Sequence, residues 1–518
     1  MKTLKAGRRE WVGLAVIALP CLLYSMDLTV LHLAVPRLTV DLEPSSVQLL
    51  WIIDIYGFFV AGSLITAGTL GDRIGRRRML LIGAALFGAA SILAAFSRSA
   101  GMLIATRALL GVAGATVAPS TLSLIRNMFL DPKQRTTAIS IWIMSFSLGG
   151  AIGPLLGGVM LEYFWWGSVF LVSVPVMVLL LIVGPFLLPE YRDPNAGKLD
   201  LLSAGLSLAA VLSVIYGLKR IAQDGPSVTA VVFVVVGAGL GMAFARRQLK
   251  LADPLLDLRL FHIPSFRSSL VMYGGCILVS FGGFLFIPQY LQLVLGLSPF
   301  KGGLWTLPWA AGFVIGSLAT PALARRIRPA LIMSWGLVLS ATGYFLLALA
   351  GSTASSLALF GAANFIMTLG ASPLFTLTND IIIGSAPPER AGAASGISET
   401  CAEFGGALGI AIFGSIGVAI YRGMLAQSVG IGLSPEMASV ALSTLGGAVA
   451  VSHQLPAQLA AALVGAAREA FVRGFVLCAV ISGVGSLAFA VYAARMFHRT
   501  AVLPRHTAEH EIGIVAAD

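Results

Sequence analysis

The chain has 518 residues, of which 57% are hydrophobic and only 11% are charged. A soluble protein of this length needs far more charge to cover its surface, so the composition excludes a soluble fold and indicates an all-α polytopic membrane protein. The 34 Lys and Arg residues exceed the 23 Asp and Glu residues and give a net charge of +11. A basic balance can indicate nucleic-acid binding, but here the basic residues cluster in alternate short loops, as positive-inside sorting requires.

The first apolar segment follows a basic N-terminus and carries Asp27. It continues well past the length of a signal-peptide core, so we interpret it as an uncleaved membrane span. A helix needs about 20 mostly apolar residues to cross a bilayer. By this criterion we predict 14 spans, at 11–35, 47–70, 78–97, 101–124, 136–160, 167–188, 199–219, 227–246, 267–290, 301–323, 330–350, 355–384, 391–421 and 471–496.

The orientation of these spans follows from the basic residues. An even number of spans puts both termini on one side of the membrane. With cytoplasmic termini, 25 of the 34 Lys and Arg residues lie on the cytoplasmic side, as the positive-inside rule demands. We therefore expect a multi-pass protein of the bacterial cytoplasmic (inner) membrane with both termini in the cytoplasm.

The spans divide into two sets of six with a pair between them. We expect an N-terminal six-helix bundle at 1–190, an inserted hairpin with its linkers at 191–266, a C-terminal six-helix bundle at 267–497 and a cytoplasmic tail at 498–518. Paired six-helix halves place a binding site near the middle of the membrane, between the halves. The loop 422–470 carries two short helix signals, at Ser434 and at Leu455–Pro456, and is either a cap on the outer face or a gate or partner surface.

Two glycine-rich motifs resemble those of a known family. The turn GTLGDRIGRRR at 68–78 contains Asp72 and Arg73, and by its spacing and position it resembles the signature loop of the major facilitator superfamily. We expect it to lock helix ends at the inner face. The run GGAIGPLLGG at 149–158 resembles the fifth-helix motif of facilitator antiporters, and Gly153 and Pro154 within it allow a bend.

Charged residues inside the spans are candidates for function because each costs a few kcal/mol or more in the bilayer. Asp27 and Asp54 lie at similar depth, about 10 to 13 Å below the outer surface at 1.5 Å per residue. Glu399 and Glu403 are one turn apart on one helical face. Two carboxylates this close rarely ionise together, so they form a candidate site for a proton or a dication.

Structural roles compete with these interpretations. Asp54 could bond a neighbouring helix, and Asp380, near the inner end of its span, could bond only the adjacent loop. Arg107 resembles the arginine of the fourth-helix facilitator motif, which is tied to proton coupling, but it could also pair with a buried acid. Asp27 has no such alternative as a helix cap, because it lies in mid-span.

Aromatic residues occupy the same spans as the acids. Aromatic faces beside carboxylates suit flat lipophilic cations, although a single ring is more often a packing or lipid contact. The candidates for substrate contact are Tyr24, Tyr56, Trp142 and Trp309.

Three further segments, 26–30, 51–56 and 398–403, resemble the 14-helix drug:proton antiporters of the superfamily. The resemblance implies a proton-coupled antiporter, not an enzyme, that exports quaternary ammonium compounds, dyes and methyl viologen-like cations. It assigns Asp27 and Asp54 to cation recognition and proton exchange, and Glu399 and Glu403 to further proton binding. Residues 301–323 lack the acid that favours divalent cations in some members of the family.

The sequence also bears on cofactors, on metal sites and on alternative functions. No nucleotide-binding motif is present, so we expect no cofactor and transport driven by the proton gradient. Separately, we expect a monomer. The four cysteines lack metal-ligand spacing, so we expect neither a disulfide nor a metal site. The alternatives are an exporter of an endogenous metabolite, lipid or antibiotic, and a membrane receptor or scaffold that transports nothing.

Overall fold

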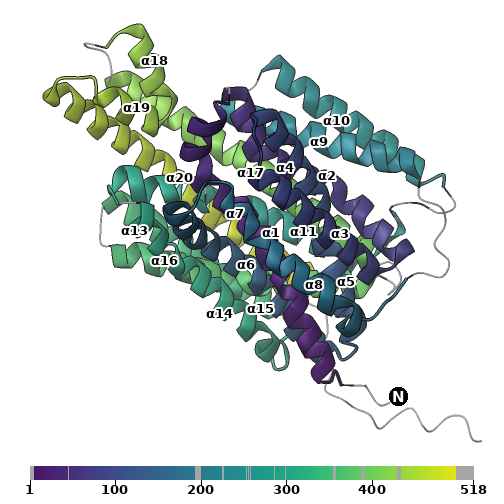
Figure 1. The fold of residues 1–518 in the computed structure, drawn as a ribbon. Coiled ribbons are helices and arrows are strands. Elements are labelled where there is room, and N and C mark those ends of the chain that lie inside the picture. The colour runs from purple at the N-terminus through teal and green to yellow at the C-terminus, as the bar shows by residue number, and fades with distance from the viewer. Residues whose placement is uncertain are drawn as a thin grey trace, which may run out of the picture.

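The computed structural model describes residues 5–44, 46–192, 200–224, 227–251, 254, 256, 258–284, 286–297, 299–353, 357–386, 391–428 and 433–496. These residues form helices and connecting turns, without a strand among them (Figure 1). The fold class expected from the sequence, an all-helical polytopic architecture, is therefore confirmed.

The helices follow one another with short connections. The first eight are α1 (Arg8–Leu42), α2 (Ser46–Ile74), α3 (Arg76–Ala95), α4 (Ala100–Gly114), α5 (Val117–Met128), α6 (Pro132–Tyr163), α7 (Ser168–Leu171) and α8 (Ser173–Leu187). A helical pair follows, α9 (Leu201–Asp224) and α10 (Val228–Gln248). The remainder comprises η1 (Leu258–His262), α11 (Pro264–Phe284), α12 (Ile287–Gln289), η2 (Tyr290–Val294), α13 (Pro299–Leu304), α14 (Leu307–Ala324), α15 (Pro329–Thr353), α16 (Leu357–Ser385), α17 (Ala391–Ser428), α18 (Pro435–Ser443), α19 (Leu445–Ser452) and α20 (Ala457–Met496).

A helix stands at each predicted span. Within the described residues, 11 helical stretches are long and apolar enough to cross a membrane, and 202–218 is a shorter apolar helix. Helices α2 and α6 occupy the second and fifth predicted spans and are 29 and 32 residues long. The helices are compatible with 14 crossings, and that number stays a prediction.

Local sequence signals explain where several helices begin. The Ser99 hydroxyl accepts a hydrogen bond from the backbone N–H of Met102 at 3.2 Å and caps α4. Asp131 caps α6, which has proline at its first position, where a missing N–H costs nothing. Between α2 and α3, Gly75 has a φ of 110°, a conformation that favours glycine, and it breaks the helix at the basic turn.

Small residues bring α1 and α6 together. A Cβ at Gly149 would collide with the backbone of Leu22, and one at Gly153 would collide with the hydroxyl of Thr29. Membrane helices pack closely at such small residues. Helix α6 runs as one helix through this motif, so the glycines act here as a packing surface, and the expected bend stays a prediction.

The pair α9 and α10 lies on one flank of the bundle (Figure 1). Helix α9 contacts both α2 and α17, which also contact each other. An apolar cluster joins all three, with Phe58 from α2, Ile215 from α9 and Ala407 from α17. The pair therefore covers the seam between α2 and α17.

The segment expected to be a long external loop is mostly helical. Ser434 caps α18 as its sequence predicts, because its hydroxyl accepts a hydrogen bond from the N–H of Met437 at 3.2 Å. The second signal, at Pro456, opens the 40-residue helix α20 instead of a short helix, and α19 lies before it. This segment projects beyond the bundle (Figure 1) and is anchored by Tyr421, whose hydroxyl donates to the carbonyl of Ala441 at 2.9 Å.

Candidate functional site

A buried ion pair joins α1 to α4. Nη1 of Arg107 lies 2.6 Å from Oδ2 of Asp27. Asp27 is 7% exposed and Arg107 is 1% exposed, so water screens neither charge. The structure thus brings together the mid-span acid and the base of the fourth-helix motif, the pairing that the sequence left as an alternative for Arg107.

Arg107 also holds α2. Its Nε donates to the carbonyl of Ile52 at 3.1 Å, and its guanidinium lies 4.9 Å from the ring centroid of Tyr56. Ile52 lies inside the continuous helix α2, so the guanidinium adds a second hydrogen bond to a carbonyl that the helix already engages. One side chain therefore links α1, α2 and α4, and protonation of Asp27 would remove one of these three connections.

Aromatic rings surround this pair. Tyr24 packs against Tyr56, with ring centroids 6.1 Å apart, and against Phe146 at 5.6 Å. Trp142 stands edge-on to Phe146 at 4.8 Å, and its indole Nε1 donates to the hydroxyl of Thr121 at 2.9 Å. The candidate aromatics of the first half thus form one cluster, in which the polar edge of Trp142 is already bonded.

The side chains of Asp54 and Pro154 lie outside the described residues, although α2 and α6 run through both positions. The roles expected for these two residues stay predictions.

The acids of the second half, Glu399 and Glu403, are half-buried and one turn apart on α17. Cys401 and Ala402, which lie between them in the chain, pack against the apolar core that contains Tyr24 of α1. Helix α17 can approach α2 closely because a Cβ at Gly396 would lie only 2.8 Å from the carbonyl oxygen of Leu64. The two glutamates and the aromatic cluster of α1 therefore belong to one central region.

A hydrogen bond from α11 reaches Glu399. The Tyr273 hydroxyl in α11 donates to Oε1 of Glu399 at 3.4 Å. The residue before Glu399 is bonded to α16, because the Ser398 hydroxyl donates to Oδ1 of Asn379 at 3.0 Å. Nδ2 of Asn379 in turn donates to the carbonyl of Phe375 at 3.1 Å in its own helix. Side chains of α11 and α16 therefore bond both Glu399 and its neighbour.

The candidate Trp309 belongs to a row of rings in the second half. It packs against Phe313 with centroids 6.0 Å apart, Phe313 lies 5.6 Å from Phe375, and Phe375 lies 5.7 Å from Tyr273. The row leads from Trp309 to the residue that bonds Glu399. Trp309 is therefore connected to the central acids through other rings.

The basic turn meets α17 at one end of the bundle. Oδ2 of Asp72 accepts a hydrogen bond from the backbone N–H of Ala393 at 3.1 Å, and Asp72 also pairs with Arg76. A carboxylate is favourable at a helix N-terminus, where N–H groups lack partners inside the helix. Arg73 lies in the last turn of α2 beside this contact.

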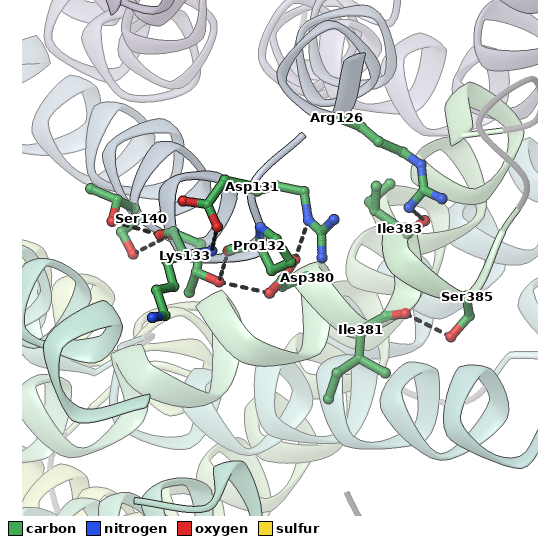
Figure 2. A network of polar contacts seen from close by, with 12 residues as sticks. Arg126, Asp131, Pro132, Lys133, Ser140, Asp380, Ile381, Ile383 and Ser385 are labelled. Carbon is green, nitrogen blue, oxygen red and sulfur yellow. Dashed lines mark hydrogen bonds and ion pairs between the residues drawn. The ribbon is translucent and has the colours of Figure 1, made fainter. Parts of the chain in front are cut away.

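Two arginines of the first half bind α16 at the same end (Figure 2). Nε of Arg135 lies 2.8 Å from Oδ1 of Asp380, and the Thr136 hydroxyl donates to Oδ2 at 2.9 Å. Arg126 donates to the carbonyls of Ile383 and of Ala386, the second at 2.7 Å. Asp380 therefore bonds across to the other half of the chain, a pairing that the sequence did not indicate, and a functional role for Asp380 stays a prediction.

Sequence reasoning missed several of these residues. Arg126 and Arg135 counted only toward the positive-inside distribution, and Tyr273 and Asn379 carried no signal. The order Ser398-Glu399 places a hydroxyl beside a candidate acid, which is a weak hint at best. The partners of Arg135 and Tyr273 are 245 and 126 residues away in the chain, beyond the reach of any local pattern.

Apolar helices of spanning length that enclose ion-paired charges define a multi-pass membrane protein. A sequence model of the Major Facilitator Superfamily matches residues 17–410, and the chain belongs to this superfamily. The family resemblance found in the loop motif is thereby confirmed. The superfamily consists of membrane transporters.

Relatives and a solved structure agree with this assignment. The chain is 44% identical over 497 residues to the multidrug efflux pump LfrA of Mycolicibacterium smegmatis, covering 96% of this chain and 98% of LfrA. It is 36% identical to the methyl viologen resistance protein SmvA of Salmonella typhimurium, covering 90% of this chain and 93% of SmvA. The human organic anion transporter MFSD10 superposes with a TM-score of 0.59 at 16% identity, covering 93% of this chain and 99% of MFSD10, which shows a shared fold.

Proposed function

We propose that the protein exports lipophilic cationic drugs and antiseptics across the bacterial cytoplasmic membrane in exchange for protons. The observation that carries this proposal is the central region where the segment of α17 that carries Glu399 and Glu403 packs against the core that contains the aromatic cluster around Tyr24. Acids beside aromatic rings attract a flat cation through charge and cation–π contact. The names of LfrA and SmvA support drug efflux, and quaternary ammonium compounds, dyes and methyl viologen-like cations are the substrates we expect.

We further propose that the acids have different roles, with Glu399 and Glu403 binding the drug and Asp27 controlling the contacts of Arg107. Asp27 is already paired with Arg107, so a cation there would have to displace a buried guanidinium. Glu399 is half-buried and accepts one long hydrogen bond among the described residues, so it is the better contact for the drug. In this scheme a proton on Asp27 neutralises the partner of Arg107 and loosens α1 from α2 and α4. Glu399 and Glu403 exchange protons for the bound cation.

The contacts of Asp72, Arg126 and Arg135 support a gate at one end of the two halves. We propose that this end faces the cytoplasm, that residues 1–190 and 267–497 form the moving bundles, and that 191–266 is an inserted hairpin. The inter-half contacts would then break when the protein loads its substrate from inside. We keep the expectation of a monomer that needs no cofactor.

The experiment that tests the proposal is ethidium transport in everted membrane vesicles. We expect uptake into the vesicles when a proton gradient is imposed, and its collapse when a protonophore removes the gradient. Uptake that survives the protonophore and follows ATP would overturn proton coupling. Gradient-driven transport of a metabolite without any transport of ethidium, benzalkonium or methyl viologen would overturn the substrate class and favour the endogenous exporter. No transport of either kind would favour a receptor or scaffold.

A further inference from the structure

The residues that follow α8 dock on the basic turn between α2 and α3. We call residues 188–191 the α8 tail. The carboxylate of Glu190 accepts hydrogen bonds from the backbone N–H groups of Arg77 and Arg78, each at 3.2 Å. Gly75, which stands directly before α3, has no side chain that could cap this helix. The α8 tail therefore supplies the carboxylate that the N-terminus of a helix favours.

Helix α3 and the end of α8 cap each other. The carbonyl of Tyr191 accepts from the N–H of Arg76 at 3.1 Å, so the α8 tail engages the first three N–H groups of α3. In return, Nη1 of Arg77 donates to the carbonyl of Pro185 at 3.0 Å. That carbonyl cannot accept the usual helical bond, because Pro189 stands four residues later and has no N–H. Two segments far apart in the chain are thus fixed to each other.

The carboxylate of Glu190 also lies against the sharp turn at Gly75. Gly75 has a φ of 110°, a conformation that favours glycine. A Cβ at this residue would lie only 2.5 Å from Oε1 of Glu190. Because glycine has no Cβ, the carboxylate can approach the turn, and there it fixes the direction in which α3 leaves α2.

The start of α3 is connected to the second half of the chain through Arg76. This residue is 1% exposed, and its guanidinium pairs with Asp72 and donates to the hydroxyl of Ser123 in α5. Oδ2 of Asp72 in turn accepts from the backbone N–H of Ala393 in α17 at 3.1 Å. Arg76 is the first residue of α3, so its position depends on how the α8 tail holds that helix end. A continuous series of contacts therefore runs from Glu190 to α17.

We propose that Glu190 is a positioning residue for the contact between the two halves. By holding the start of α3, it directs Arg76 at Asp72 and so keeps Asp72 on the N-terminus of α17. Loss of Glu190 should favour the state in which this end is open. The inference rests on the proposed gate, but it depends neither on the substrate nor on proton coupling. Because the α8 tail leads toward the hairpin of α9 and α10, it also ties the start of that linker to the gate.

A cysteine at Ser395 reports opening beside Ala393. Ser395 is fully buried in α17, and its hydroxyl has no hydrogen-bond partner among the described residues, so Ser395→Cys removes no bond. The protein is placed in nanodiscs, where both faces are accessible, and treated with a charged maleimide. Mass spectrometry then follows labelling at each cysteine separately. We expect Glu190→Ala to raise the labelling rate at residue 395 several-fold.

Two controls separate opening from loss of folding. Glu10→Ala removes the same charge at the same end of the bundle, but the Glu10 carboxylate accepts from the N–H of Gly7 in its own segment, so labelling at residue 395 should stay at the native rate. Cys478 is fully buried in α20 and should remain unlabelled in every variant, because only global unfolding would expose it. Glu190→Gln keeps an oxygen acceptor and should cause a smaller increase than Glu190→Ala.

Double variants test whether Glu190 acts through Asp72. Adding Glu190→Ala to Asp72→Asn should change the labelling rate little, because both substitutions break the same series of contacts. Adding it to Asp380→Asn should multiply the two effects, since Asp380 holds a separate contact between α6 and α16.

Three results would overturn the inference. The first is a native labelling rate in Glu190→Ala, which would leave Glu190 a structural role in the first half alone. The second is faster labelling of Cys478 together with residue 395, and the third is an effect that multiplies with Asp72→Asn as it does with Asp380→Asn. A failure of ethidium transport in the native protein would reject the proposed function instead, because the labelling rates need no substrate.

Discussion

The buried guanidinium of Arg107 serves three helices at once, and each of its connections depends on the others. Asp27 supplies the only ion pair to this guanidinium among the described residues, and Ile52 supplies a backbone acceptor. A buried charge that loses its partner is strongly unfavourable. A neutral residue at position 27 therefore changes folding as well as transport, and the two effects have to be separated.

We predict that Asp27→Asn abolishes proton-coupled efflux and lowers stability by about 3 to 5 kcal/mol, because Arg107 stays charged and buried. Arg107→Gln should lower stability by a similar amount. The double variant should be more stable than either single variant, since no unpaired charge remains, but it should still not transport. Thermal unfolding in detergent and ethidium efflux measure the two quantities. Additive stability losses would show that the pair is not coupled.

Tyr273 offers a test of Glu399 that leaves the charge in place. Tyr273→Phe removes the hydroxyl that donates to the glutamate, so the ionised form of Glu399 loses a stabilising contact. We predict that the pH midpoint of ethidium efflux moves upward by a fraction of a unit, with little change in protein amount. Tyr290→Phe is the matched control, because its hydroxyl donates to the carbonyl of Ala350 instead. An unchanged midpoint in Tyr273→Phe would remove Tyr273 from the site.

At the scale of the helix, hydropathy and capping residues predict most of the fold. Span positions follow from the length of each apolar run, and starts follow from residues such as Ser99 and Ser434. The central acids and Arg107 could be found because charge is rare in a membrane helix. Their partners could not be found, since pairs such as Arg135 with Asp380 depend on how distant helices pack. Helix α19 was missed because it has only eight residues, two of them glycine, although Thr444 caps it by accepting from the N–H of Gly447 at 3.0 Å.

The glycines of α6 give a prediction about packing. Gly149→Ala places a Cβ against the backbone of Leu22, which cannot move aside, so we expect a loss of about 1 to 3 kcal/mol in stability. Gly158 belongs to the same motif, but a Cβ there meets nothing within 4 Å. Gly158→Ala should be neutral or slightly stabilising, because alanine favours the helix. Thermal unfolding of the two variants checks the contrast, and equal effects would refute close α1–α6 contact.

The hairpin of α9 and α10 is closed by Asp200 at the end where α9 begins and α10 ends. This carboxylate caps α9 and binds Nε of Arg247 at the end of α10 at 2.8 Å. The hydrogen bonds from Arg247 and from Ser203 hold the pKa of Asp200 below its usual range. A carboxyl group with a lowered pKa stabilises the fold above its unfolded pKa of about 3.9 and loses that effect only as the pH falls through the folded value.

We therefore predict that hairpin closure does not respond to pH in the range where transport operates. Nitroxides on Leu202→Cys and Leu249→Cys, which are exposed at the closed end, should report the same distance at about pH 8 and about pH 5. A distance that grows at the lower pH would make this ion pair a pH switch and contradict the prediction.

For the whole molecule, we expect the contacts between the two halves near Asp380 to determine whether that end of the protein is open or closed. Asp380 is shared by Arg135 and Thr136, so its neutralisation removes an ion pair between α6 and α16. We predict that Asp380→Asn favours the state open at this end. A cysteine at Ser140, which is buried one turn further along α6, should then react faster with an impermeant maleimide in everted vesicles.

Asp131→Asn is the matched control, because the Asp131 carboxylate accepts a hydrogen bond from the N–H of Lys133 in its own helix. It removes the same charge at the same end without touching α16. Maleimide added to intact cells should leave Ser140→Cys unreacted in every variant if this end faces the cytoplasm. Equal reaction rates in the two aspartate variants would mean that charge alone, and not the link between halves, sets the state.

The hairpin of α9 and α10 also bears on how the number of helices can change during evolution. Its two helices run in opposite directions, since Asp200 at the start of one meets Arg247 at the end of the other. Adding or deleting the pair leaves every later helix in its original direction. Lipid tails are as apolar as the side chains that the hairpin covers, so exposing Phe58 or Ala407 to the bilayer costs little. We therefore propose that the hairpin is an insertion, because its gain or loss would leave the directions of the other helices unchanged.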